Sequence, residues 1–234
     1  MLKKNILVTG ASKGIGKALT IKFAREGHFV YATSRSIEIV GEYAEEKKLT
    51  PNIFPQALDV TNREAIIELV AKLEKTSPIY CVINNAGITS FRKAEHDTFE
   101  TIEDIVNTNL LGAINLIKAS LPGMIERKSG AIINIISVAA DKVFTNSSIY
   151  AASKIGLQTY SKVLREELRE HNIQVINVLP GATKTEIWSE EMREQFGDRM
   201  MTPEDIADVV FNAFEMSDKL VQEEIILRPK LGDL

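Results

Sequence analysis

The residues Thr9-Gly10-Ala11-Ser12-Lys13-Gly14-Ile15-Gly16 join an apolar, β-branched run to an amphipathic segment. The run before them, Asn5–Thr9, is typical of a buried strand, and the apolar residues from Ile15 to Phe23 recur at helical spacing. A strand, a glycine-rich turn and a helix in this order direct free backbone N–H groups at a ligand, and the helix dipole favours a pyrophosphate there. The Gly-x-x-x-Gly-x-Gly spacing departs from the commonest dinucleotide fingerprint, so an ordinary glycine-rich turn is the alternative interpretation.

The rest of the chain repeats this alternation of short apolar runs and longer helical patterns. It predicts an α/β fold, with a doubly wound, mostly parallel seven-stranded sheet covered by helices on both faces. We expect one domain over residues 1–234, with a substrate lid at about 183–201, above the carboxyl ends of the strands. The predicted strands are Asn5–Thr9, Phe29–Thr33, Ile53–Leu58, Ile79–Asn84, Ala131–Ser137, Ile173–Leu179 and Glu224–Arg228.

Composition excludes several classes of function. The chain has 234 residues, 44% of them hydrophobic, which is enough for a packed core. Twenty-eight basic against thirty-two acidic residues give a net charge of −4, which disfavours binding to nucleic acid. We expect a cytoplasmic protein without a membrane segment, in which the single cysteine, Cys81, is a buried thiol. The histidines His28, His96 and His171 are scattered, so we expect no metal site.

The end of the second predicted strand indicates which dinucleotide the turn would hold. An acidic residue there holds the ribose hydroxyls of NAD, whereas an arginine accommodates the 2′-phosphate of NADP. This chain has Ser34 and Arg35 at that corner and no carboxylate, and Lys13 in the glycine turn adds a second cation. The pattern favours NADP(H). The alternative is that both cations are ordinary solvated surface charges.

Tyr150 and Lys154 are spaced i and i+4, so on a helix their side chains share a face. An ammonium near a phenol favours the phenolate and lowers the phenol's pKa. Such a phenol can donate a proton to a carbonyl oxygen, or accept one from an alcohol. Taken alone, the pair is common on helix surfaces.

Several motifs together resemble the short-chain dehydrogenase/reductase family from Lys4 to about Arg228. They are Thr9-Gly10-x-x-x-Gly14-Ile15-Gly16, Asn84-Asn85-Ala86-Gly87, the four residues Asn109, Ser137, Tyr150 and Lys154, and Pro180-Gly181. They stand in the order of that family's cofactor turn, fourth-strand motif, catalytic tetrad and sixth-strand turn. The resemblance implies a Rossmann fold and an NADPH-dependent carbonyl reductase or alcohol dehydrogenase.

The resemblance also implies a role for each of the four catalytic positions. Tyr150 is the expected acid/base, and Lys154 is expected to hold the nicotinamide ribose and to lower the tyrosine's pKa. Ser137 is expected to bind the substrate oxygen. Asn109 is expected to hold a water that connects Lys154 to bulk solvent.

Cofactor contacts follow from the same resemblance. Asp59 and Val60 are expected at the adenine, although Asp59 has an alternative interpretation as a helix cap. Asn84 and Asn85 also have an alternative role as buried amides that join adjacent loops. The full set of expected cofactor-binding residues is Gly10, Ala11, Ser12, Lys13, Gly14, Ile15, Gly16, Ser34, Arg35, Asp59, Val60, Asn85, Ala86, Gly87, Tyr150, Lys154, Pro180, Gly181, Thr183 and Thr185.

The substrate side is predicted less sharply. Trp188, Met192 and Phe196 recur at helical spacing, so they form either a packing face or the apolar roof of a pocket, with Phe91 and Phe144 as further wall residues. The substrate is expected to be a carbonyl or alcohol, either a 3-oxoacyl thioester or a small keto or hydroxy compound. The competing hypothesis is a catalytically idle dinucleotide-sensing or scaffold protein.

The long helical stretches at 99–126 and 150–170 correspond to the helices by which relatives pair. We therefore expect a homodimer or homotetramer.

Overall fold

A computed structural model describes residues 2–216 and 219–234. Its centre is a seven-stranded sheet in the order β3-β2-β1-β4-β5-β6-β7, with every pairing parallel. The order reverses between β1 and β4, as in doubly wound dinucleotide folds. The strands are β1 (Asn5–Thr9), β2 (Phe29–Ser34), β3 (Ile53–Ala57), β4 (Cys81–Asn84), β5 (Gly130–Ile135), β6 (Ile173–Pro180) and β7 (Glu224–Leu227).

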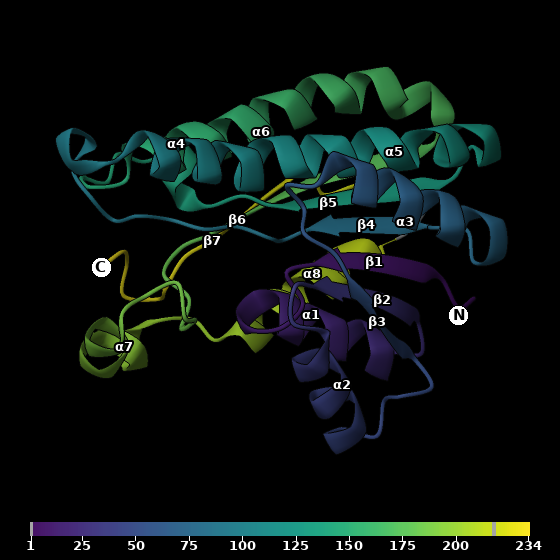
Figure 1. Ribbon diagram of the computed structural model, residues 1–234, viewed down its shortest axis with the longest axis horizontal. Helices are drawn as coiled ribbons and strands as arrows, with labels where there is room; N and C mark the ends of the chain where they lie inside the picture. The colour runs from purple at the N-terminus through teal and green to yellow at the C-terminus, as the bar shows by residue number, and fades with distance from the viewer. Residues whose placement is uncertain (1, 217–218) are drawn as a thin grey trace.

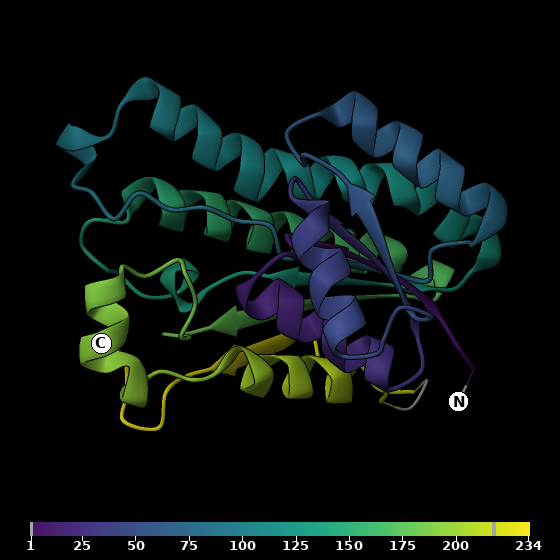
Figure 2. The ribbon, with the colours of Figure 1, turned by 60° about the horizontal axis from the view of Figure 1, so that its bottom comes forward.

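Helices cover both faces of the sheet, as Figures 1 and 2 show. Helices α1, α2 and α8 lie on one side, while α3, α4, α5 and α6 lie on the other. A short helix, α7, stands apart near the carboxyl ends of the strands. The helices are α1 (Gly14–Arg25), α2 (Ile37–Glu46), α3 (Arg63–Thr76), α4 (Phe99–Val106), α5 (Gly112–Arg127), α6 (Ser148–Leu168), α7 (Glu190–Phe196) and α8 (Pro203–Phe214).

The alternation of side chains along each strand divides the core in two. On β1, Ile6 and Val8 face the α1/α8 side, where they join Phe23 of α1, and Leu7 faces the α3/α5/α6 side. All are fully buried. Strands covered on both faces are therefore apolar at almost every position, which explains why β5 is apolar apart from Asn134.

The predicted doubly wound fold is confirmed, and the sheet is parallel in every pairing. Some element boundaries differ from the prediction. β4 begins at Cys81, two residues later than predicted. β5 ends at Ile135, two residues earlier than predicted, which leaves Ser137 beyond the strand. The predicted helix at 99–126 is interrupted by a five-residue π-helical segment, Asn107–Leu111.

A row of polar side chains crosses the sheet interior in register. Asn84, Asn134, Asn177 and Glu224 are aligned on β4, β5, β6 and β7. Each amide Nδ2 donates to the next side chain, at 2.8 Å from Asn84 to Asn134, 3.2 Å from Asn134 to Asn177, and 3.0 Å from Asn177 to Glu224. Because unpaired amides are costly in a core, this row strongly favours one register among four strands.

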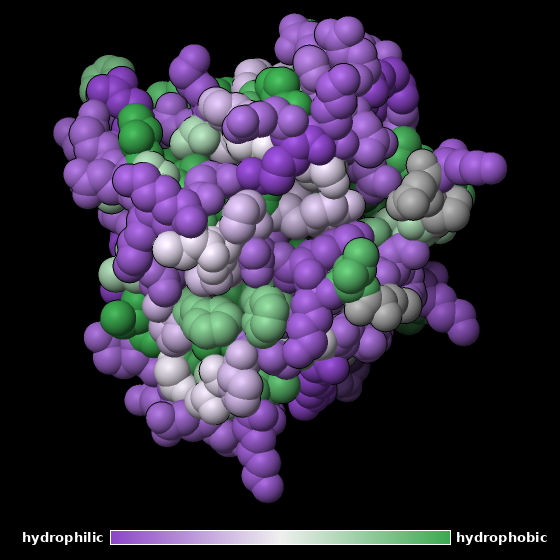
Figure 3. Space-filling view, turned by 90° about the vertical axis from the view of Figure 1, so that its right-hand side faces the viewer, coloured by the Kyte–Doolittle hydropathy of each residue, from purple (hydrophilic) through white to green (hydrophobic). Residues whose placement is uncertain are grey.

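The carboxyl ends of the strands meet at the edge where α7 lies. The segment that carries α7 is closed at its base by a parallel bridge between Thr183 and Met201. At the other end of the molecule, around the N-terminus, the surface is mostly hydrophilic with small separate apolar patches (Figure 3). Within 2–216 and 219–234, no helix combines the length and apolarity needed to span a membrane.

Candidate active site

The glycine turn after β1 is built so tightly that two of its positions exclude a side chain. Gly10 has a left-handed backbone, with φ +66°. A Cβ on Gly16 would lie 2.2 Å from the carbonyl oxygen of Gly10 and 2.4 Å from Asn85 Nδ2. Asn85 Nδ2 in turn donates to the carbonyls of Thr9 and Gly10, at 2.9 and 3.2 Å. Asn85 therefore joins adjacent loops, as its alternative interpretation predicted, and it lines the main cavity as well.

Helix α1 begins without a side-chain cap. Lys13, at the N-cap position, makes no capping hydrogen bond, and the first turn contains no acidic residue. In contrast, α8 begins with a complete capping box between Thr202 and Asp205. The first backbone N–H groups of a helix carry a partial positive charge. At α1 they are thus suited to a phosphate ligand.

The corner beyond β2 carries the two expected cations. Lys13 and Arg35 are exposed and line the same cavity. Ser34 is buried, and its Oγ accepts from the N–H of Ser36 at 3.0 Å. Asp59 also lines the cavity.

The Asp59 carboxylate accepts hydrogen bonds from the N–H and hydroxyl of Thr61, at 2.9 and 2.7 Å. These bonds, with a smaller contribution from Arg35, hold the pKa of Asp59 below its ordinary value. The cap of α3 is Asn62 rather than Asp59, and it accepts from the N–H of Ala65 at 3.0 Å. The carboxylate of Asp59 thus fixes a turn at the cavity edge.

Asn109 lies in the π-helical segment between α4 and α5. Its Oδ1 accepts from the N–H of Ile88 at 2.8 Å, and its Nδ2 donates to Ile88 O at 2.9 Å and to Ser153 Oγ at 3.0 Å. Ser153 Oγ donates to the carbonyl of Tyr150 at 2.7 Å. Asn109 therefore joins the segment after β4 to the first turns of α6, and its side chain does not line the main cavity.

Tyr150, Lys154 and Ser137 come together at the cavity wall, as the sequence predicted. Ser137 follows β5, where its Oγ accepts from the N–H of Ala139 at 3.1 Å. Lys154 is buried, and its Nζ donates to the carbonyl of Ile135 at 2.8 Å. An ammonium has three N–H donors, so within the described residues two remain for a ligand or a water.

The pKa directions at this centre differ from the expectation. Burial raises the pKa of Tyr150, and a hydrogen bond with Ser137 offsets part of that rise. The Nζ of Lys154 stands 5.8 Å from the phenol ring centre and donates to the carbonyl of Ile135 rather than to the phenol. Burial lowers the pKa of Lys154 to about 8. Without bound cofactor, Tyr150 thus carries its proton at neutral pH.

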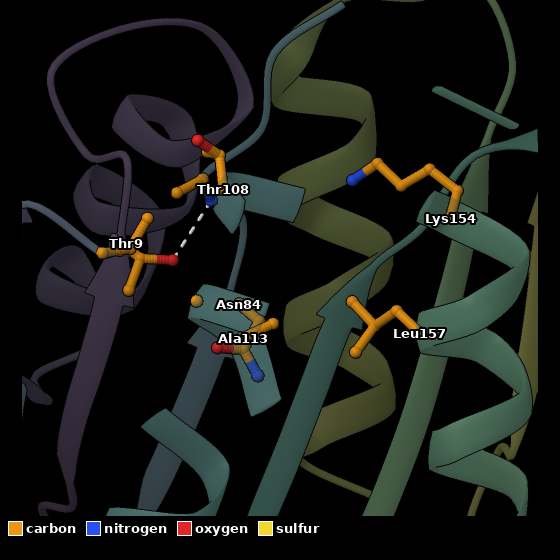
Figure 4. A pocket seen from close by; sticks show the side chains of 9 residues that line it. Thr9, Asn84, Thr108, Ala113, Lys154 and Leu157 are labelled. Carbon is orange, nitrogen blue, oxygen red and sulfur yellow. Dashed lines mark hydrogen bonds between the residues drawn. The ribbon is translucent and has the colours of Figure 1, made fainter. Parts of the chain in front are cut away.

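The main cavity has a volume of about 870 Å³, within the range of sites for small molecules and cofactors. The predicted residues that line it are Gly10, Ser12, Lys13, Gly14, Ile15, Ser34, Arg35, Asp59, Val60, Asn85, Ala86, Gly87, Ser137, Tyr150, Lys154, Pro180, Gly181, Thr183 and Thr185. A much smaller cavity, of about 10 Å³, is lined by Thr9, Asn84 and Lys154 among others, and Lys154 extends into it from α6 (Figure 4).

Two predicted cofactor residues do not line the cavity. Ala11 is fully buried, where its N–H donates to Thr33 O at 3.0 Å and its carbonyl accepts from the Tyr43 hydroxyl at 3.0 Å. Gly16 is also buried, against Gly10. Both residues shape the turn from behind.

The roof of the cavity differs from the predicted helical stripe. Trp188 precedes α7, which begins at Glu190 with Ser189 as its cap. Its ring stacks on Phe91, with centroids 5.0 Å apart and planes at 19°. Trp188, Met192, Phe91 and Phe144 all line the cavity, whereas Phe196 does not.

Sequence reasoning included Thr9 in the turn motif without assigning its contact, and it missed Asp233. Thr9 Oγ1 accepts from the N–H groups of Asn85 and Ala86, at 3.0 and 3.1 Å, and so holds the β4 turn in place. Asp233, 83 residues after Tyr150, lines the cavity from the chain's far end. Thr9 was identifiable as the last residue of β1, but no sequence pattern distinguishes Asp233.

Within the described part of the chain, no group of three or more His, Cys, Asp or Glu side chains is placed to hold a metal ion.

The family model for short chain dehydrogenases matches residues 4–195. The chain belongs to this family. Sepiapterin reductase of Chlorobaculum tepidum is 34% identical, over 100% of this chain and 99% of its own length. The NADP-dependent 3-hydroxy acid dehydrogenase of Shigella flexneri is 34% identical, over 88% of this chain and 87% of its own.

Among solved structures, this short chain dehydrogenase is similar to the closed form of a serine dehydrogenase complexed with NADP+. The two have a TM-score of 0.89 and 31% identity, with 95% of this chain and 94% of that chain covered. The single-domain Rossmann architecture and the family resemblance are thereby confirmed.

Proposed function

We propose that this chain is an NADP(H)-dependent oxidoreductase that reduces a carbonyl to an alcohol, or catalyses the reverse reaction. The observation that carries the proposal is the convergence of Tyr150, Ser137 and Lys154 on one wall of the cavity that also contains the glycine turn. Carbonyl reduction requires a proton donor close to a bound nicotinamide cofactor. The short chain dehydrogenase fold brings the two together in this cavity.

The residues present fit an NADP(H) molecule. The uncapped start of α1 is suited to the pyrophosphate, and Gly10 and Gly16 let the backbone approach it. Lys13 and Arg35 are placed for the 2′-phosphate, with no acidic residue at the end of β2 to repel it. One relative is named as NADP-dependent and a similar structure contains NADP+, which agrees with this chemistry.

The roles of the catalytic residues follow from their positions. Tyr150 holds its proton and donates it to the carbonyl oxygen, while the Ser137 hydroxyl binds and orients that oxygen. Lys154 binds the nicotinamide ribose through the N–H groups not used by Ile135. Asn109 fixes the start of α6 through its contacts with Ile88 and Ser153, and its role in holding a water for Lys154 stays a prediction. When bound, NADPH supplies the hydride.

A small keto or hydroxy compound is the substrate class that we favour. Two similar proteins, a 3-hydroxy acid dehydrogenase and a serine dehydrogenase, are named for such compounds, whereas a third, at 36% identity, is named as a 3-oxoacyl-[acyl-carrier-protein] reductase. The apolar wall of Phe91, Trp188 and Met192 accepts an uncharged body, and the segment 183–201 acts as the lid. An idle scaffold on this fold is disfavoured, because such proteins have no need to keep a tyrosine, a serine and a buried lysine together.

We infer that copies of this chain form a homodimer or homotetramer, which pairs through α6 and the α4–α5 stretch. Exposed apolar side chains on this face, Leu111, Ile155 and Val163, are 44%, 48% and 57% exposed. Pairing between two copies buries such a face.

The experiment for the proposed function is a panel of small ketones, 3-hydroxy acids and a 3-oxoacyl thioester, each with NADPH or NADP+ and with NADH or NAD+. The nicotinamide absorbance is followed. We expect turnover of at least one small keto or hydroxy compound, with the phosphorylated cofactor preferred. Binding of neither dinucleotide, together with no turnover on any compound, contradicts the proposal.

A further inference from the structure

The segment 229–234 turns back on itself at the substrate end of the cavity. Gly232 has a left-handed backbone, with φ +87°, and its N–H donates to the carbonyl of Pro229 at 2.9 Å. This tight turn directs Asp233 and Leu234 inward, where both residues line the same cavity as Ser137 and Tyr150. A glycine allows this reversal because other residues seldom adopt that backbone.

The Asp233 carboxylate is held by two basic side chains. Lys142 Nζ donates to Oδ2 at 2.9 Å, and Arg228 donates to both oxygens, with Nε to Oδ1 at 3.0 Å and Nη2 to Oδ2. The Asp233 side chain is only 15% exposed. Although burial acts to raise it, the hydrogen bonds from Lys142 and Arg228 hold the pKa of Asp233 below its ordinary value. The carboxylate therefore stays charged across the neutral range.

These contacts join parts of the chain that bear on the reaction. Lys142 lies five residues after Ser137, on the loop that continues to the wall residue Phe144. Arg199 follows α7, the helix of the lid, and its Nη2 donates to the backbone carbonyl of Asp233 at 3.3 Å. One residue thus connects the loop after Ser137, the end of β7 and the far end of the lid.

We propose that the carboxylate of Asp233 is a positioning group that fastens this turn to the Ser137 loop and to the end of β7, beside the backbone contact with the lid, and thereby determines which substrates fit the cavity. The proposal rests on the proposed function, because it assigns the substrate end of the same site. The bidentate contact with Arg228 gives the carboxylate a defined geometry as well as a charge. Without it, the turn and the wall that it holds are free to move away from Tyr150.

The test compares Asp233→Asn with Glu64→Gln, on the full chain. Glu64 is a matched control, because its carboxylate also accepts two bonds from one arginine, Arg63, at 3.2 and 2.9 Å, but it lies on α3 and does not line the cavity. We expect Asp233→Asn to raise KM for the smallest accepted substrate by about tenfold. KM for NADPH stays within about twofold of the wild type in both variants, since the cofactor half does not depend on Asp233.

A second readout is salt dependence, which a merely structural change does not move. Lys142 and Arg228 are 47% and 39% exposed, so added salt partly screens their pairs with Asp233, and KM of the wild type for the carbonyl substrate rises with ionic strength. In Asp233→Asn that rise is lost. An unchanged carbonyl KM, or equal changes in the KM values for substrate and cofactor, overturns the proposal.

Hydrogen exchange separates this proposal from the proposed function. If no substrate is turned over by the wild type, the amides of the Ser137–Phe144 loop and of residues 231–234 are compared between wild type and Asp233→Asn. Loss of protection in both segments supports the fastening role. Protection equal to that of the wild type overturns it.

Discussion

The two halves of the cavity are held in different ways. In the cofactor half, the contacts are made with the main chain. Gly16 packs against Gly10, and the side chains of Asn85 and Thr9 hydrogen-bond to main-chain groups. In the substrate half, the contacts are between side chains: Phe91 stacks on Trp188, and Asp233 forms ion pairs with Lys142 and Arg228. The first arrangement tolerates almost no substitution, whereas the second can be rebuilt with other residues. This difference explains how one fold can keep its cofactor while its substrate changes.

The largest effect is expected where the cofactor half is tightest. Gly16→Ala places a methyl group 2.2 Å from Gly10 O, so the turn or α1 must shift. We expect a loss of about 1–3 kcal/mol in the free energy of unfolding and loss of NADPH binding, measured by urea denaturation and by titration. Gly41→Ala in α2 is the control, because nothing lies within 4 Å of its Cβ. If both variants bind NADPH like the wild type, the turn is not the cofactor cradle.

The choice between the two dinucleotides is the next most sensitive property. Arg35→Glu puts a carboxylate beside the expected 2′-phosphate, so the Kd for NADPH should rise by about tenfold or more, while that for NADH changes little. Titration with each dinucleotide measures both values. Lys72→Glu, which makes the same charge change on α3 outside the cavity, should alter neither. Equal effects of Arg35→Glu on NADPH and NADH would refute the 2′-phosphate assignment.

The pH dependence of kcat/KM tests the residues where the two halves of the cavity meet, Tyr150 and Lys154. Lys154 has a pKa of about 8, so it loses its charge as the pH rises through that value, while Tyr150, whose pKa is raised, keeps its proton. We expect kcat/KM for NADPH in the reductive direction to fall above about pH 8, approaching tenfold per pH unit, since this ratio reports the free enzyme. A flat profile from pH 7 to beyond pH 9 is incompatible with this assignment.

The smallest effect is expected in the substrate half. Phe91→Leu keeps an apolar side chain but removes the stack on Trp188, which contributes about 0.5–1.5 kcal/mol. KM for the carbonyl substrate should rise a few-fold, with KM for NADPH unchanged. The control is Phe54→Leu, which removes a similar stack with Tyr31 away from the cavity. A change in KM for NADPH that exceeds the change for the substrate contradicts the division into two halves.

Most of the fold was predictable because strands of a parallel sheet have a recognisable, nearly continuous apolar sequence. The run Ala131–Ile136 is apolar except for Asn134, since both faces of the sheet are covered. The glycine turn was predictable for a similar reason, because close backbone contact leaves few allowed residues. The ends of strands were less so: Ser137 lies beyond β5, although the apolar run leads directly to it.

Other features depended on contacts that sequence spacing does not encode. The π-helical segment at Asn107–Leu111 has no pattern that separates it from an ordinary helix, yet it carries Asn109. Trp188 matched a helical stripe by spacing but precedes the helix. The upward shift of Tyr150's pKa comes from burial, and Lys154 donates to Ile135 rather than to the phenol. Neither feature follows from the i, i+4 spacing of the two residues.

The central claim, that Tyr150 is the proton donor beside the bound dinucleotide, is tested most directly by Tyr150→Phe. The rate of NADPH oxidation with an accepted carbonyl compound and the Kd for NADPH are measured on the same preparation. We predict a fall in kcat of about 10²-fold to 10⁴-fold, with the Kd nearly unchanged. A variant that turns over at the rate of the wild type contradicts the account.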